Sequence, residues 1–127
     1  MLVPARVGVD AVHIPTWEHH LALGGEALLK RIYTDDEIAF CEGRGERLST
    51  RLAGKEATLK VLGTGIRGVA LSDVEIVTAP TGRPTITLHG PALGHASELG
   101  LDRVDISLCH EQQMALAVAA GLTGVLP

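Results

Sequence analysis

The segment from Leu48 to Leu62 restricts the fold most, because it places apolar residues on two sides of one helix. At 3.6 residues per turn, leucines form one stripe and smaller apolar residues lie nearly opposite. The first side holds Leu48, Leu52, Leu59 and Leu62, and the second holds Ala53, Ala57 and Val61. The sequence therefore predicts a long helix that is packed on two sides, with a narrow polar flank between them.

Charged residues in this helix are its candidate functional groups. Glu56 and Lys60 lie one turn apart on the polar flank, an arrangement that suits a metal and phosphate site. Lys55 falls in the middle of the leucine stripe. It is either a lysine whose stem packs while its head reaches water, or a phosphate ligand. Arg51 is either a plain exposed arginine or a bidentate phosphate ligand on the same groove.

The remaining elements are short and follow recognisable boundaries. Thr34-Asp-Asp-Glu37 is a capping box that starts a helix. Alternation and turn residues predict strands over 3–14, 74–78, 85–89, 104–109 and 114–120. Helical stretches are predicted from 15 onward, with a break at 24–25, and over 92–99. Glycines at 43–45 predict a further break, before the long helix. This order is typical of an α+β fold, with a largely antiparallel sheet packed against the long helix, in a single domain spanning 1–127.

The amino-acid composition bears on subunit association and on cellular location. One Trp, one Tyr and one Phe leave a core of small aliphatic side chains, which favours further burial between subunits. Cys41 and Cys109 have neither disulfide-framework nor zinc-type spacing, and no signal peptide or membrane-spanning run is present, so we expect a cytoplasmic protein without membrane insertion.

The charge distribution is uneven. The net charge is −4, yet eight of the eleven basic residues lie between Lys30 and Arg67, where six acidic residues accompany them. Such a segment fits an acidic or phosphorylated partner, or an ordinary mixed-charge surface. The overall sign and the scarcity of aromatic residues argue against nucleic acid.

Asp10, at the end of the first strand, and Glu56 make a plausible carboxylate pair for magnesium, which takes one or two carboxylates together with waters and phosphate oxygens. In the plainer interpretation, Asp10 forms a turn at the end of the strand, and Glu56 pairs with Lys60 on the surface of the helix. The glycine turns at Gly63-Thr-Gly65 and Gly82-Arg83-Pro84 could approach a ligand but match no phosphate-binding motif. Ser107-Leu-Cys-His110 lies where a strand ends and lacks a hydrolase nucleophile elbow.

Taken in order, these pieces resemble holo-[acyl-carrier-protein] synthase, the small bacterial type of 4′-phosphopantetheinyl transferase. The resemblance spans nearly the whole chain. It rests on Val7-Gly-Val-Asp10, Arg51-x-x-x-Lys-Glu-Ala-x-x-Lys60, Leu62-Gly-Thr-Gly65, Gly82-Arg-Pro84, and Ser107-x-x-His110 leading into Met114-Ala-Leu-Ala-Val118.

The resemblance implies transfer of phosphopantetheine from coenzyme A to a serine of apo acyl carrier protein, in a homotrimer with sites at the subunit junctions. Asp10 and Glu56 would hold Mg²⁺, and Lys60 would contact phosphate. Glu56, or a metal-bound water that it orients, would take the serine proton. The coenzyme would be bound by Arg51, Lys60, Gly63, Gly82, Arg83, Pro84 and, from a neighbouring subunit, His110.

Three positions depart from the family pattern. His13 replaces a usual Glu, Cys109 a usual Ser or Thr, and Thr16 an arginine that docks the acidic carrier. We expect the metal site to survive and Lys30, Arg31 and Arg44 to take over part of the docking. Two other functions are compatible with the residues: a non-catalytic module that binds coenzyme A or a nucleotide, and a magnesium-dependent phosphohydrolase.

Overall fold

The computed structural model describes residues 1–124, which fold into two antiparallel sheets and four α-helices. The strands are β1 (Leu2–His13), β2 (Val74–Thr78), β3 (Pro84–Leu88), β4 (Arg103–Glu111) and β5 (Met114–Gly124). The helices are α1 (Ile14–Ile32), α2 (Asp35–Cys41), α3 (Gly45–Leu62) and α4 (Gly90–Glu98), with a 3₁₀ turn at Leu71–Asp73.

The α+β class and the antiparallel pairing are confirmed. The strands form two sheets rather than one, a three-stranded sheet in the order β1-β5-β4 and the separate hairpin β2-β3. Asp10 pairs with Ala117, and Leu108 of β4 pairs with the same residue from the other side. Asp10 and Leu108 therefore lie at the same level on opposite edges of the three-stranded sheet.

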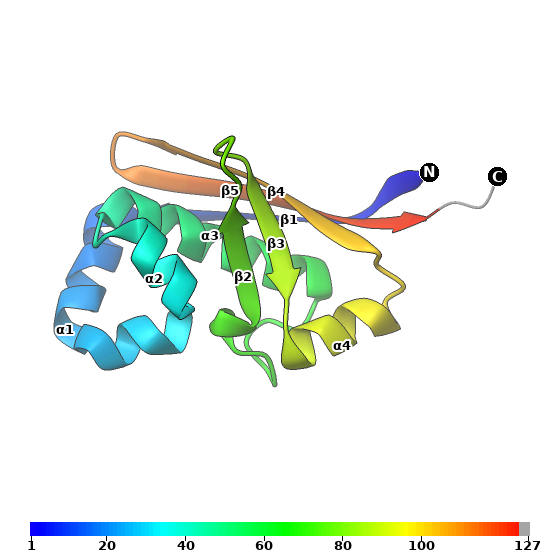
Figure 1. The fold of residues 1–127 in the computed structure, drawn as a ribbon, viewed down its shortest axis with the longest axis horizontal. Helices are drawn as coiled ribbons and strands as arrows, with labels where there is room; N and C mark the ends of the chain where they lie inside the picture. The colour runs from blue at the N-terminus through cyan, green and yellow to red at the C-terminus, as the bar shows by residue number, and fades with distance from the viewer. Residues whose placement is uncertain (125–127) are drawn as a thin grey trace.

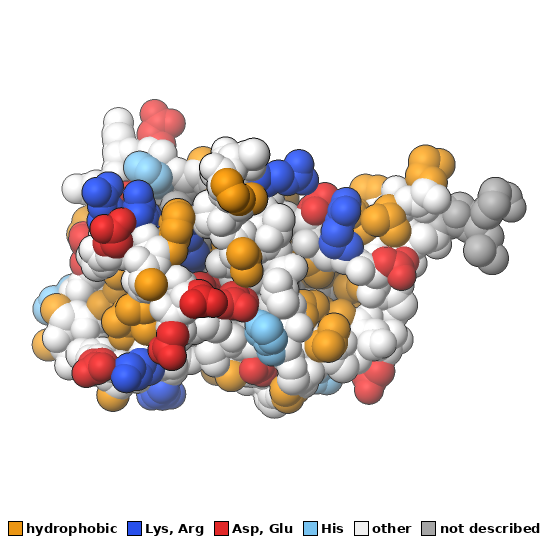
Figure 2. Space-filling view, viewed as in Figure 1, with side chains coloured by type: hydrophobic (Ala, Val, Ile, Leu, Met, Phe, Trp, Pro, Cys, Tyr) orange, Lys and Arg blue, Asp and Glu red, His pale blue; other side chains and the backbone are white. Residues whose placement is uncertain are grey.

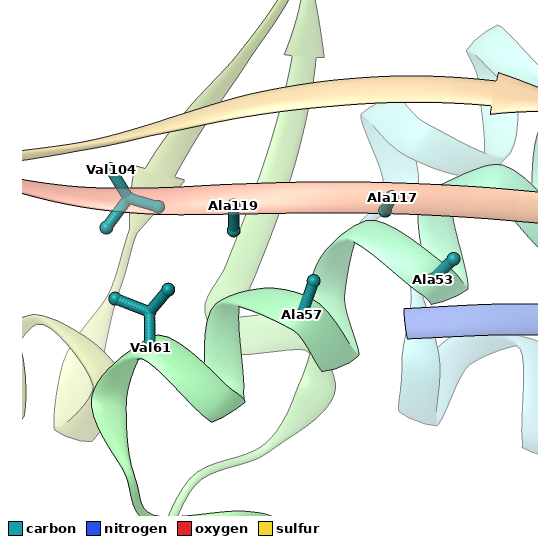
Figure 3. Close-up of a cluster of buried hydrophobic side chains, with 6 residues drawn as sticks. All are labelled: Ala53, Ala57, Val61, Val104, Ala117 and Ala119. Atoms are coloured by element: carbon teal, nitrogen blue, oxygen red, sulfur yellow. The ribbon is translucent and has the colours of Figure 1, made fainter. Parts of the chain in front are cut away.

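Helix α3 lies between the two sheets (Figure 1). Its alanine side packs against the three-stranded sheet, where Ala53, Ala57 and Val61 meet Val104, Ala117 and Ala119 (Figure 3). Its leucine side contributes Leu59 and Leu62 to a second cluster with the hairpin and α4, and Leu48 to a third with α1 and α2. Both predicted apolar sides of this helix are confirmed.

Small residues allow this close packing. A Cβ at Gly8 would overlap the carbonyl oxygen of Ala57, so only glycine lets β1 approach α3 this closely. The approach matters for the site, because Asp10 follows Gly8 on the same side of the strand. The close approach of β1 to α3 therefore brings the Asp10 carboxylate against the polar flank of α3.

The predicted helix boundaries at Thr34 and in α1 are also confirmed. Thr34 and Glu37 form both bonds of the capping box. Helix α1 is kinked at Gly25, whose φ of 63° lies in the left-handed region. His13 caps α1, with its Nδ1 2.7 Å from Oγ1 of Thr16, so two of the three residues that depart from the family pattern hydrogen-bond to each other.

The outer face of the three-stranded sheet is apolar and uncovered in the single chain. Val7, Val9 and Val118 are 72%, 59% and 48% exposed, and Leu116 lies on the same face. The alternation predicted for β1 is therefore correct from Arg6 onward, and a register shift between Pro4 and Arg6 interrupts it before that point. Val7 and Val9 point away from α3, while Gly8 and Asp10 point toward it.

Candidate active site

The three predicted catalytic residues meet on the open flank of α3. Nζ of Lys60 lies 3.1 Å from Oδ1 of Asp10 and donates to the carbonyl oxygen of Val9 at 2.8 Å. Glu56 lies one turn before Lys60, and both are more exposed than their buried neighbours Lys55 and Ala57. Asp10, Glu56 and Lys60 together are called the carboxylate cluster below.

Glu56 has the unusual protonation behaviour expected of a functional group. Burial, followed by the hydrogen bond and the negative charge of Asp10, raises its pKa to about 7, and Lys60 partly opposes the shift. Two neighbouring carboxylates cannot both ionise without cost, so the charge of Asp10 favours the protonated form of Glu56. A carboxyl group with a pKa near neutrality can take up a proton during a reaction.

The cluster also fits a divalent cation. Oδ2 of Asp10 is buried and has no hydrogen-bond partner, although buried carboxylate oxygens normally have one. Within residues 1–124 no group of three or more His, Cys, Asp or Glu side chains gathers in one place. Two carboxylates match magnesium, which keeps several waters and takes oxygens from a bound phosphate.

A second group of predicted residues lines a cavity of about 170 Å³ on the β4 side of the sheet. Its walls come from the first half of α3, the tip of the β2-β3 hairpin and the end of β4. They are formed by Thr50, Arg51, Gly82, Pro84, Leu108, Cys109 and His110. This group is called the hairpin cavity below. Four of the seven were named from the sequence as site residues, and Cys109 was noted only as a departure from the family pattern. Thr50 and Leu108, which carry no recognisable motif, were missed.

The two groups lie at opposite edges of the three-stranded sheet. The carboxylate cluster is on the β1 edge and the hairpin cavity on the β4 edge, with β5 between them. His110 shares its cavity with Arg51 and Gly82 of its own chain. A single chain thus offers two half-sites.

Besides Lys60, two predicted ligands of the coenzyme lie outside the hairpin cavity. Gly63 ends α3 with a φ of 74°, one turn beyond Lys60 and beside the guanidinium of Arg6. Arg83 is exposed at the tip of the hairpin and is not among the residues that line the cavity. Gly63 therefore belongs with the carboxylate cluster by position.

Lys55 has neither of the roles that the sequence suggested. Its side chain is completely buried, and Nζ donates to Oε1 of Glu37 at 2.7 Å and to the carbonyl of Val74 at 2.6 Å. A further bond reaches the carbonyl of Leu71. Burial lowers the pKa of Lys55, while the charge of Glu37 opposes that shift. Lys55 ties α2 and β2 to α3 and contacts neither water nor the carboxylate cluster.

Comparison with known proteins agrees with this geometry. Residues 6–119 match the family described as the 4′-phosphopantetheinyl transferase superfamily. Holo-[acyl-carrier-protein] synthases of Koribacter versatilis and Gloeobacter violaceus are each 40% identical, over 87% and 91% of this chain and 91% and 90% of their own lengths. The chain belongs to this superfamily.

Solved structures extend the likeness to the fold. The holo-[acyl-carrier-protein] synthase of Neisseria meningitidis is 31% identical with a TM-score of 0.83, covering 94% of this chain and 98% of its own. The Helicobacter pylori enzyme in complex with coenzyme A is 26% identical, also with a TM-score of 0.83, covering 91% and 98%. Both half-sites therefore belong to a phosphopantetheinyl transferase fold.

No helix in residues 1–124 has the length and apolarity to cross a bilayer.

Proposed function

We propose that this chain transfers the 4′-phosphopantetheine group from coenzyme A to a serine of apo acyl carrier protein. The observation that supports this most is the carboxylate cluster, which places a carboxyl group of raised pKa, a buried unpartnered carboxylate oxygen and a lysine side by side. The names of the relatives and the structure in complex with coenzyme A support the same activity.

In the proposed reaction, Glu56 accepts the proton of the carrier serine. The serine oxygen forms a bond to the phosphorus that bears the pantetheine arm. The bond from that phosphorus to the bridging oxygen breaks, and its electron pair leaves with adenosine 3′,5′-bisphosphate. Such transfers depend on alignment and charge neutralisation, so Lys60 would contact the pyrophosphate, and Asp10 and Glu56 are the residues that would hold magnesium. Bound there, magnesium would neutralise charge on the pyrophosphate.

The test is direct modification of carriers. Incubation with coenzyme A, Mg²⁺ and a panel of apo carriers should add about 340 Da to at least one carrier, the mass of the covalently attached arm. A parallel reaction without carrier should release no adenosine 3′,5′-bisphosphate. Release without carrier would indicate a phosphohydrolase, and coenzyme binding without modification of any carrier would indicate a binding module.

Magnesium affinity should depend on pH because a proton on Glu56 competes with the metal. With a pKa of about 7 in the metal-free protein, Glu56 is mostly protonated below neutrality and ionised above it. Affinity should therefore fall about tenfold per pH unit below pH 7 and level off above it. Titration calorimetry at pH 6, 7 and 8 measures this, and Glu56→Gln should remove the dependence. A wild-type affinity that is constant over this range would contradict the assignment.

We further propose a homotrimer in which the carboxylate cluster of one subunit faces the hairpin cavity of the next. Two independent observations support it: the two half-sites lie at opposite edges of one sheet, and the outer sheet face carries exposed Val7, Val9 and Val118. Contiguous apolar faces of this kind usually mark interfaces.

Val9→Asp should convert the trimer to monomers, because a charge in the centre of an apolar interface loses its hydration. Val77→Asp is the matched control, since Val77 is also an exposed strand valine, at 43%, but lies on the hairpin. Light scattering after size exclusion gives the oligomeric state. A monomeric wild-type protein, or a trimeric Val9→Asp variant, would refute the proposed interface.

A further inference from the structure

Arg51 lies on the wall of the hairpin cavity with its guanidinium over an aromatic ring. Its Cζ is 4.5 Å from the ring centroid of Phe40, the only Phe in the chain. A guanidinium over a ring at this distance gains a cation–π attraction. Phe40 is 38% exposed and lines a separate hollow beside the hairpin, so it approaches Arg51 from outside the cavity.

Two hydroxyl groups fix the edge of the same guanidinium. Nη2 donates to Oγ1 of Thr78 at 2.9 Å, and Nη1 donates to Oγ1 of Thr50 at 3.2 Å. Thr50 is next to Arg51 on α3, whereas Thr78 comes from the end of β2. The ring contact and the two hydrogen bonds leave the guanidinium little freedom to rotate.

The charge of Arg51 is not neutralised within residues 1–124, where no carboxylate pairs with it. The comparison with Arg47 is informative, because its Cζ lies 4.9 Å from the same ring but its Nη1 pairs with Glu42 at 3.3 Å. Figure 2 shows basic side chains near the turn between α2 and α3, with an acidic side chain among them. Since Arg51 also lines a cavity, its remaining N–H groups are available to an anion.

We propose that Phe40 and Thr78 are positioning residues that hold Arg51 in place for a phosphate group at the nucleotide end of the donor. The inference rests on the proposed function for the identity of that donor. A guanidinium fixed before binding recognises phosphate with two parallel bonds and loses little conformational freedom. Neither positioning residue needs to touch the donor.

The test compares Phe40→Leu and Thr78→Val with matched controls. Phe40→Tyr keeps the aromatic face, and Thr85→Val makes the same change on the other strand of the hairpin, where the hydroxyl bonds to the carbonyl of Val77. Calorimetry gives the dissociation constants of coenzyme A, dephospho-coenzyme A and adenosine 3′,5′-bisphosphate. Carrier modification gives kcat and KM, and thermal unfolding checks the fold.

We expect Phe40→Leu to weaken coenzyme A binding about 3- to 30-fold and Thr78→Val about 2- to 10-fold. KM should rise while kcat stays near wild type, and both controls should bind as wild type does. In an Arg51→Gln background, Phe40→Leu should have little further effect, because residues that act through a common partner are not additive.

Loss of affinity confined to coenzyme A and the bisphosphate would assign Arg51 to the 3′-phosphate, and parallel loss with dephospho-coenzyme A would assign it to the pyrophosphate. Unchanged affinity in both variants, a lower kcat at unchanged KM, or full additivity with Arg51→Gln would overturn the proposal. A wild-type protein that binds coenzyme A but modifies no carrier would refute the proposed function alone, since the binding constants test the positioning separately.

Discussion

Replacement of Glu56 by glutamine should reduce the rate of carrier modification by about 10²- to 10⁴-fold, the usual contribution of a positioned general base. Glutamine has the same shape but can neither accept the serine proton nor offer the metal a charged oxygen. Single-turnover mass spectrometry with saturating coenzyme A measures the rate. Glu98→Gln, the same change on the exposed surface of α4, is the matched control and should act as wild type does.

Titration with magnesium separates the two roles of Glu56. Asp10→Asn removes a carboxylate that is assigned to the metal alone, so raised Mg²⁺ should restore much of its activity. Glu56→Gln should remain slow at every Mg²⁺ concentration, because the base is missing. Near-normal turnover of Glu56→Gln, or its full recovery by magnesium, would remove Glu56 as the base. Both variants should unfold near the wild-type temperature, because their side chains are partly open to solvent.

Lys55→Met should destabilise the protein by about 3–5 kcal/mol, the cost of leaving one member of a buried ion pair without its partner. Glu37 would keep a buried charge, and the carbonyls of Val74 and Leu71 would lose their donor. Urea unfolding at fixed protein concentration measures the change, since the stability of an oligomer depends on concentration.

A double variant tests whether the loss of stability comes from the pairing of Lys55 with Glu37. Glu37→Gln removes the orphaned charge. Its single carbonyl oxygen can accept from only one of the two amides, Thr34 and Ile76, which bond to separate oxygens of Glu37. Lys55→Met/Glu37→Gln should therefore be more stable than the sum of the single changes predicts, by about 1–3 kcal/mol. Lys60→Met is the control for stability, because its ammonium is largely exposed, and it should unfold much as wild type does. Additive effects of the Lys55 and Glu37 changes would contradict the pairing.

The fold was largely predictable because its signals are local. The capping box at Thr34, the alternation of β1 from Arg6 onward and the two apolar sides of α3 depend on residues close in sequence, and all are confirmed. The separation into two sheets was not predictable, because it depends on α3 passing between them. The outward direction of Val7 and Val9 was hidden for the same reason: alternation gives two faces but does not say which one is covered.

The charged residues of α3 show what helical spacing can and cannot predict within the site. Helical spacing was enough to put Glu56 and Lys60 on one open flank, and the resemblance to the family joined Asp10 to them. Spacing could not determine whether Lys55 reached water or a phosphate, because its partner Glu37 lies 18 residues away on α2. For a buried charge the partner decides the role, and partners distant in sequence are brought together only by the fold.

The sequence by itself determined the long two-sided helix, the order of elements, the Asp10–Glu56–Lys60 group and the resemblance to the family to which the chain belongs. The tertiary structure decided which charges are structural, which sheet face is bare, and that the predicted site residues divide between two edges of one sheet. The reason is physical: helix and strand periods fix the direction of a side chain relative to its own element, whereas burial, pKa and partnership depend on what the other elements place against it.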